Sequence, residues 1–191
     1  MVSDLILSLF AFYFFFQHRI YDRKWSLFFL FMGISSFTGG MYHGFFENVE
    51  QLRFLSWGLF SLALIYAQLA AYQEVKNNLI KITFVLKSIV LLYFSIQTVS
   101  FGFLVIDTIF SLFGFVVIGN LLFLKSLSNY ISYGILVSFI SVFVVVFKTD
   151  IHPEYLTQND IGHYITIFSL AVMSKGIRED ALPYSLKIDD V

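Results

Sequence analysis

The stretch KSIVLLYFSIQTVSFGFLVIDTIFSLFGFVVIGNLLFLK, from Lys87 to Lys125, decides the fold. Between its two lysines lie 37 residues whose only charged side chain is Asp107. At about 1.5 Å per residue, a single helix of this length far exceeds the roughly 30 Å hydrocarbon core of a bilayer. The stretch therefore predicts a hairpin of two membrane-spanning helices. Its midpoint places Asp107 close to the turn, and Thr98 to Gly102 is the alternative position of that turn.

The composition of the whole chain supports a membrane protein. Of its 191 residues, 58% are hydrophobic and 13% are charged, which leaves too little polar surface to cover a water-soluble globule. The chain contains no cysteine, so disulfide bonds and thiolate metal sites are excluded.

Five further apolar runs flank the hairpin, and each is close to the length of one bilayer crossing. They are Met1 to Gln17, Trp25 to Phe46, Phe54 to Gln73, Ser126 to Phe147 and Ile161 to Ser174. The first run has no preceding basic residue and no cleavage site, so we interpret it as a retained span. The sequence thus predicts an all-α bundle of seven transmembrane helices over residues 1–178, followed by a polar cytoplasmic tail over residues 179–191.

The distribution of lysine and arginine predicts the orientation of this bundle. Ten of the twelve basic residues fall on one side of the predicted spans. They are Arg19, Arg23, Lys24, Lys76, Lys81, Lys87, Lys125, Lys175, Arg178 and Lys187, against only Arg53 and Lys148 on the other side. The positive-inside rule places the ten in the cytoplasm, with the N-terminus outside and the C-terminus inside. In a prokaryote this would be the inner or plasma membrane. Because the ten are spread over several segments, they form no patch for binding nucleic acid.

Three of the four histidines fall on the predicted outer side: His43 late in the second span, His152 in the last loop, and His163 early in the seventh span. On a helix, Ser36, His43 and Glu47 share one face with several glycines, so this face is expected to point into the bundle. Imidazoles and carboxylates at one level are common ligands of a divalent cation. The alternative is that the outer acids and His152 are merely solvated, and that His163 has a structural role.

Two segments carry a resemblance to a known superfamily. SSFTGGMYHGF, residues 35–45, and HPEYLTQNDIGHYITIFSL, residues 152–170, resemble the alkaline ceramidases and progestin/adiponectin receptors. That superfamily has seven membrane helices and a zinc ion held by three histidines near a serine and an aspartate. The chain departs from its pattern, because Ser36 and His43 are seven residues apart instead of four and Asn159 stands where a last-span histidine is usual.

The residues and the resemblance together predict a zinc-dependent hydrolase that acts on a lipid amide or ester at the outer membrane face. The predicted zinc ligands are His43, His152 and His163, with a fourth position for water. Ser36 would stabilise the oxyanion, and Asp107, in preference to Glu47, would accept the proton of the water, with Glu50 as a further candidate. The substrate would enter from the lipid bilayer. The alternatives are a transporter or sensor of small molecules without enzymatic activity, and a structural membrane subunit.

Overall fold

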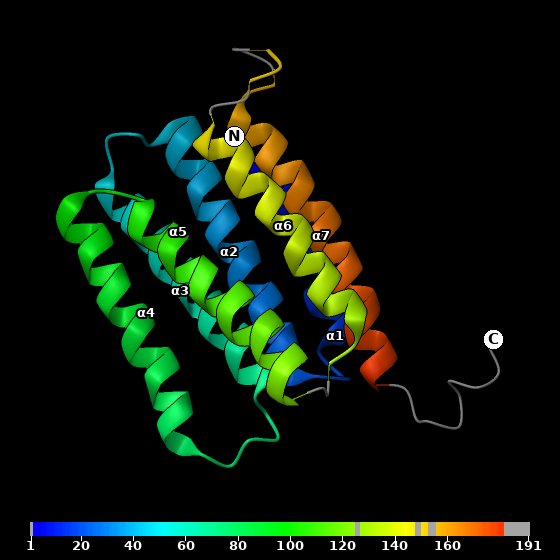
Figure 1. Cartoon of the computed structure of the whole chain (residues 1–191). Coiled ribbons are helices and arrows are strands. Elements are labelled where there is room, and N and C mark those ends of the chain that lie inside the picture. The colour runs from blue at the N-terminus through cyan, green and yellow to red at the C-terminus, as the bar shows by residue number, and fades with distance from the viewer. Residues whose placement is uncertain (1, 125–126, 148–149, 153–155, 182–191) are drawn as a thin grey trace.

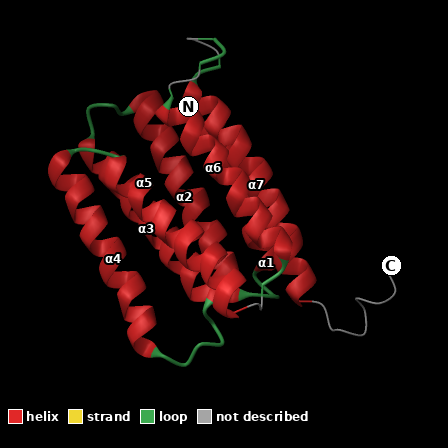
Figure 2. Ribbon diagram, viewed as in Figure 1, coloured by secondary structure: helices red, strands yellow, loops and turns green. Residues whose placement is uncertain are grey.

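The fold of this chain is a set of helices packed side by side (Figures 1 and 2). The computed structural model describes residues 2–124, 127–147, 150–152 and 156–181. Its helices are α1 (Val2–His18), α2 (Arg23–Phe45), α3 (Glu50–Ala71), α4 (Asn78–Thr98), α5 (Gly102–Thr108) with its π-helical continuations η1 (Ile109–Ile118) and η2 (Asn120–Leu124), α6 (Asn129–Val146) and α7 (Gln158–Ala181). The predicted all-helical class is confirmed for the described residues, which form seven helical segments.

Consecutive helices run in opposite directions, so the bundle has two distinct ends (Figure 1). The upper end, at the top of Figure 1, gathers the starts of α1, α3, α5 and α7, and the lower end gathers their C-terminal ends. α7 continues three residues beyond the predicted domain boundary at residue 178. The rest of the predicted tail, together with Lys125, Ser126, Lys148 and Lys187, lies outside the described residues.

Side-chain caps and one strained residue set the helix boundaries. Asp22 begins α2 by accepting hydrogen bonds from the backbone amides of Lys24 and Trp25, at 2.8 and 3.0 Å. α4 ends at Val99, whose φ of 51° lies in the left-handed region that a β-branched residue rarely adopts. The hairpin thus turns between Thr98 and Gly102, the alternative position given by the sequence. The placement of Asp107 near the turn is wrong, because this residue lies inside α5.

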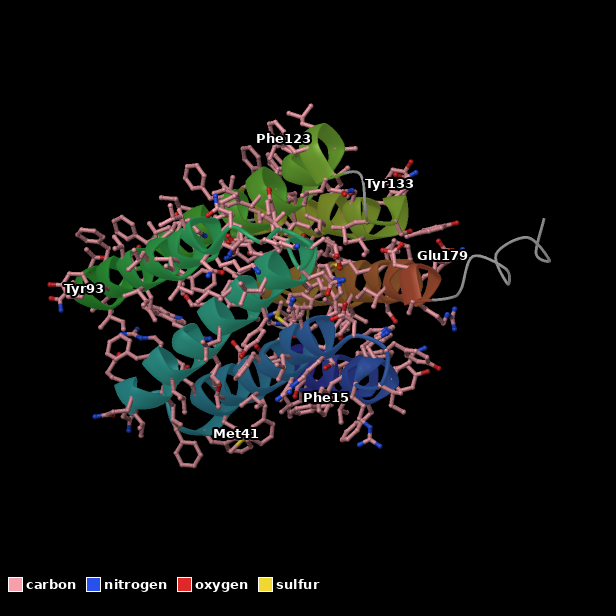
Figure 3. The ribbon with its side chains drawn as sticks, turned by 90° about the horizontal axis from the view of Figure 1, so that it is seen from below. Phe15, Met41, Tyr93, Phe123, Tyr133 and Glu179 are labelled. Carbon is pink, nitrogen blue, oxygen red and sulfur yellow. The ribbon has the colours of Figure 1, made fainter. Side chains whose placement is uncertain are left out.

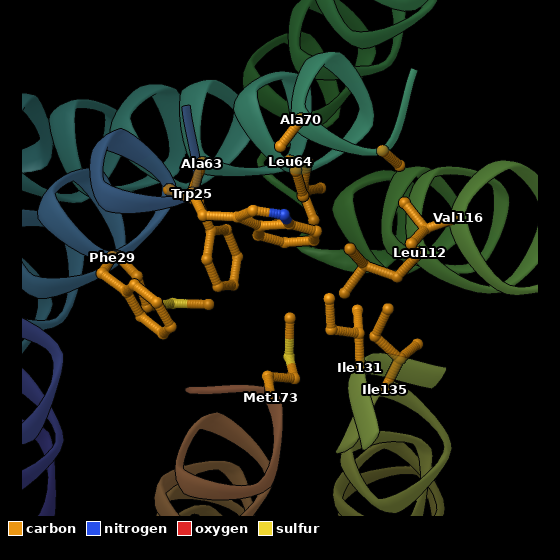
Figure 4. Packing of buried hydrophobic residues seen from close by; sticks show 14 of the residues in the cluster. Trp25, Phe29, Ala63, Leu64, Ala70, Leu112, Val116, Ile131, Ile135 and Met173 are labelled. Carbon is orange, nitrogen blue, oxygen red and sulfur yellow. The ribbon is translucent and has the colours of Figure 1, made fainter. Parts of the chain in front are cut away.

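A hydrophobic core joins α2, α3 and α7 at the centre of the bundle (Figure 4). Trp25 and Phe29 of α2 belong to one buried cluster with Leu64 of α3 and Met173 of α7, and all four are at most 2% exposed. Large apolar side chains also cover the outside, as Figure 3 shows for Tyr93 and Phe123. A helix that is apolar on all faces suits a lipid environment. Within the described ranges, four segments are long and apolar enough to cross a membrane: α3, α4, Gly102–Leu124 and α6.

α4 stands at the edge of the bundle and is joined to α5 by a buried ion pair (Figure 1). Lys87 Nζ donates to Asp107 Oδ1 and, at 2.5 Å, to Ser111 Oγ, while Ser88 Oγ donates to the same Asp107 oxygen at 3.2 Å. The Asp107 side chain is fully buried. The assignment of Lys87 to the cytoplasmic boundary is therefore corrected, since Lys87 is the tenth residue of α4 and lies within the span.

Removing one member of this pair should be far more damaging than removing both. Asp107→Leu leaves the Lys87 ammonium without its counter-ion and should destabilise the protein by about 3–5 kcal/mol, whereas Lys87→Met combined with Asp107→Leu should recover most of that loss. Thermal unfolding in detergent measures both. A double variant as unstable as the single one would contradict a pairwise role.

Close packing of α6 on α7 depends on Gly134. A Cβ atom at this position would lie 2.8 Å from Ser169 O and 2.9 Å from Met173 N. The Ser169 hydroxyl also donates to Gly134 O at 2.7 Å. The two helices thus approach through a small residue and an interhelical hydrogen bond, as is common in membranes.

Gly134→Ala should lower the stability by about 1–3 kcal/mol, because α6 and α7 must separate to make room for the methyl group. Gly162→Ala is the matched control on the same pair of helices, since its Cβ would meet only ordinary contacts from 3.6 Å. Equal unfolding temperatures for the two variants would refute this account of the packing.

Candidate functional site

Four polar side chains from α1 and α7 meet at the upper end of the bundle. We call Ser3, Asp4, Asp160 and His163 the upper cluster. The Ser3 hydroxyl donates to Asp160 Oδ1 at 2.5 Å and lies 3.0 Å from His163 Nδ1. On the other side of the imidazole, His163 Nε2 lies 3.5 Å from Asp4 Oδ1. Ser3 and Asp4 are buried, at 1% and 7% exposed.

The local sequence explains how these residues are positioned. Ser3 and Asp4 occupy the first turn of α1, where a carboxylate interacts favourably with the helix dipole. Asp160 lies in the first turn of α7 and accepts from the Thr157 amide at 3.1 Å and its hydroxyl at 2.7 Å. His163 follows three residues later, which places it on the same face of α7 as Asp160.

The hydrogen bonds of Ser3 determine which nitrogen of His163 carries the proton. Because the single hydroxyl proton of Ser3 is donated to Asp160, the His163 Nδ1–H must donate to Ser3 Oγ. In the neutral imidazole, Nε2 then presents a lone pair toward a carboxylate oxygen of Asp4. Two acceptors facing each other repel, and a cation between them removes the repulsion. A proton or a metal ion at this position would relieve that repulsion.

α2 brings a second predicted residue to the same end. A Cβ atom at Gly39 would lie 3.9 Å from Asp4 Oδ1, so this part of α2 packs beside the cluster. His43 lies one helical turn further toward the upper end and is exposed. His43 and His163 therefore stand near the same end of the bundle.

The other predicted site residues lie elsewhere. His152 is exposed in the loop between α6 and α7, where its backbone pairs with Leu156. Glu47 is exposed beyond the end of α2, and Ser36 is half-buried within that helix. Asp107 is bound by Lys87 between α4 and α5, and both of these helices pack on α3. Over the described ranges, no three His, Asp or Glu side chains are already grouped as metal ligands.

Residues 1–182 match a protein family described as a family of unknown function, DUF6962. The chain belongs to this family. The DUF6962 match spans every described helix, so the upper cluster and the Lys87–Asp107 pair both lie within it. No curated protein and no solved structure matches the chain.

Proposed function

We propose that the chain crosses the membrane seven times, with its upper end outside and its lower end in the cytoplasm. The described basic residues support this orientation through the positive-inside rule. Near the lower end are Arg19, Arg23, Lys24, Lys76, Lys81, Lys175 and Arg178, and near the upper end is Arg53. α1, α2 and α7 are less apolar or shorter than the other four spans, but they pack into the same bundle.

Cysteine labelling tests this topology directly, because the chain has no native cysteine. Glu47→Cys, in the exposed connection after α2, should react with a membrane-impermeant maleimide added to intact cells. Gln73→Cys, in the exposed connection after α3, should react only after the membrane is permeabilised. The reverse pattern would invert the orientation, and labelling of both from outside would reject seven spans.

We further propose that the upper cluster and His43 hold a divalent metal ion such as Zn²⁺, and that the protein is a metal-dependent hydrolase. The observation that carries this proposal is the 3.5 Å separation of His163 Nε2 from Asp4 Oδ1. Two ligands of one tetrahedral zinc ion, each bound at about 2.0–2.2 Å, stand roughly 3.4 Å apart. The contact between His163 Nδ1, Ser3 and Asp160 also resembles the outer hydrogen bonds that orient metal-binding histidines.

His43 is the third ligand in this proposal, in place of His152. It is exposed, so its side chain can rotate toward the cluster without disturbing the core. Two imidazoles and one carboxylate form a donor set known from catalytic zinc sites, and a fourth position stays open for water. The set draws on α1, α2 and α7, and these helices contact one another through α1.

The proposed chemistry is hydrolysis of an amide or ester of a lipid-like substrate that reaches the outer end from the bilayer. A zinc ion bound there would supply Lewis-acid activation of water and of the substrate carbonyl. Asp160 replaces Asp107 as the carboxylate that accepts a proton, because Asp107 is neutralised by Lys87, while Glu47 stays a second candidate. Ser36 is left out, because it lies about 10 Å along α2 from His43.

A proton-sensing or proton-linked transport function is the second candidate, and the same contact favours it. A proton on His163 Nε2 would convert the repulsion with Asp4 into an ion pair. Proton binding needs only His163 and Asp4, and His43 does not have to move. The two candidates differ in whether a metal ion occupies the cluster.

Metal analysis of the purified protein separates them. Wild-type protein should contain about one zinc ion per chain, and His163→Ala and Asp4→Ala should each lose most of it, because each removes a ligand. His152→Ala is the matched control and should keep its zinc. Loss of zinc in that control would indicate that His152 is a zinc ligand, as the sequence predicts.

Protein that stays metal-free after incubation with zinc would rule out the hydrolase proposal. In that case Asp4→Asn should lose more thermal stability than wild type as the pH falls from about 8 to 5, because the variant lacks the carboxylate that stabilises a protonated His163. A stability profile identical in wild type and Asp4→Asn would then reject the proton-binding candidate as well.

A further inference from the structure

A second candidate binding site lies between α3 and α4 at the lower end of the bundle, at the opposite end from the upper cluster (Figure 1). A groove of about 430 Å³ opens there to the outside of the two helices. Its walls are almost entirely apolar and come from Leu69 near the end of α3 and from Ile82, Val85 and Leu86 of α4. Walls of this kind suit the acyl chain of a lipid.

One charged side chain lines this groove. Lys81 is the fourth residue of α4, is half-buried, and lies one helical turn closer to the lower end than Val85. Over the described residues, no carboxylate lines the groove and Lys81 forms no ion pair. Asn78 also lines the groove, three residues before Lys81 and on the same face of α4. An ammonium and an amide, both hydrogen-bond donors, thus stand where the apolar walls end.

The charge around this end of the groove is positive. Lys76 is exposed in the connection between α3 and α4, five residues before Lys81. Glu74 is the one acid in that connection, so the two lysines outnumber it. Lys87, further along α4, adds no free charge because it is paired with Asp107. The groove is therefore complementary to a molecule with an apolar tail and an anionic head.

We propose that this groove binds an anionic phospholipid from the membrane leaflet at the lower end. The acyl chain lies against the apolar walls, and the phosphate accepts hydrogen bonds from Lys81 Nζ and from the side-chain amide of Asn78. Anionic lipid head groups bind in basic pockets between membrane helices by the same interactions. The site does not depend on the proposed hydrolase, because none of its residues belongs to the upper cluster.

The net charge of the head group is what this site selects. A zwitterionic phospholipid offers the same phosphate and the same chains, but its own ammonium group compensates the charge that Lys76 and Lys81 attract. One lysine close to an anionic head group is worth about a factor of five in affinity. A preference of this size is therefore expected from Lys81 alone.

The matched probes are dioleoylphosphatidylglycerol and dioleoylphosphatidylcholine, which share their chains and phosphate and differ in net charge. Native mass spectrometry of the purified full-length protein, titrated with each lipid in detergent, measures the two affinities. Wild-type protein should prefer phosphatidylglycerol about fivefold or more. Equal affinities would overturn the proposal and leave a surface for bulk lipid. A dimer that excludes both lipids would assign the groove to a second copy of the chain and overturn the proposal as well.

Two substitutions of Lys81 and one control make the test specific. Lys81→Gln should lower the preference about fivefold while keeping the affinity for phosphatidylcholine, whereas Lys81→Arg, which keeps the charge, should retain most of the preference. Lys24→Gln is the matched control, because Lys24 is also half-buried near the start of a helix at the lower end but lies outside the groove. It should keep the full preference. A preference that survives Lys81→Gln, or that falls equally in Lys24→Gln, would overturn the proposal.

A substitution in the wall tests whether the lipid occupies the groove itself. Val85→Trp fills the groove between α3 and α4 without changing any charge, so it should weaken the binding of both lipids. Affinities unchanged by Val85→Trp would place the lipid elsewhere and overturn the proposal.

Discussion

A polar group that lacks a hydrogen-bond partner in an apolar environment is costly, and this cost constrains how the helices of the bundle pack. Its consequences appear at two contacts between helices. The Asp107 carboxylate is buried only together with the Lys87 ammonium and two serine hydroxyls, and this group joins α4 to α5. The Ser169 hydroxyl satisfies the carbonyl of Gly134 at a close approach of α6 and α7. The polar contacts therefore specify which helices are neighbours, while the apolar side chains fill the space between them.

The need for a hydrogen-bond partner is met differently at the two ends of the α1–α7 contact. At the lower end, His18 is fully buried, stacks on Phe29, and its Nε2 lies 2.7 Å from the Ser174 hydroxyl. This partner is neutral and can donate or accept, so the contact requires no additional charge. At the upper end, the corresponding nitrogen of His163 faces a carboxylate. A cation would relieve the contact at His163 but is not needed at His18, so the functional proposal concerns the upper cluster.

The candidate site could be predicted only in part. The sequence singled out His43 and His163 because each stands close to one end of its predicted span. Asp160 could have been added from its three-residue spacing to His163, which places both side chains on one helix face. Ser3 and Asp4 gave no comparable signal, since their role depends on α1 packing against a helix that lies 160 residues away along the chain. Asp107 was misplaced because a midpoint rule for the hairpin ignores the left-handed turn at Val99 and the position of the Lys87 partner.

Length and composition of the apolar runs are local properties, and they determined the helical class, the approximate ends of each helix and the asymmetry of basic residues between the two ends. A helix closes its own backbone hydrogen bonds, so its existence does not depend on its neighbours. Only the tertiary structure decided the pairing of Lys87 with Asp107 and the contact of Asp4 with His163. These depend on the rotation and separation of whole helices, which the pattern of one sequence leaves open.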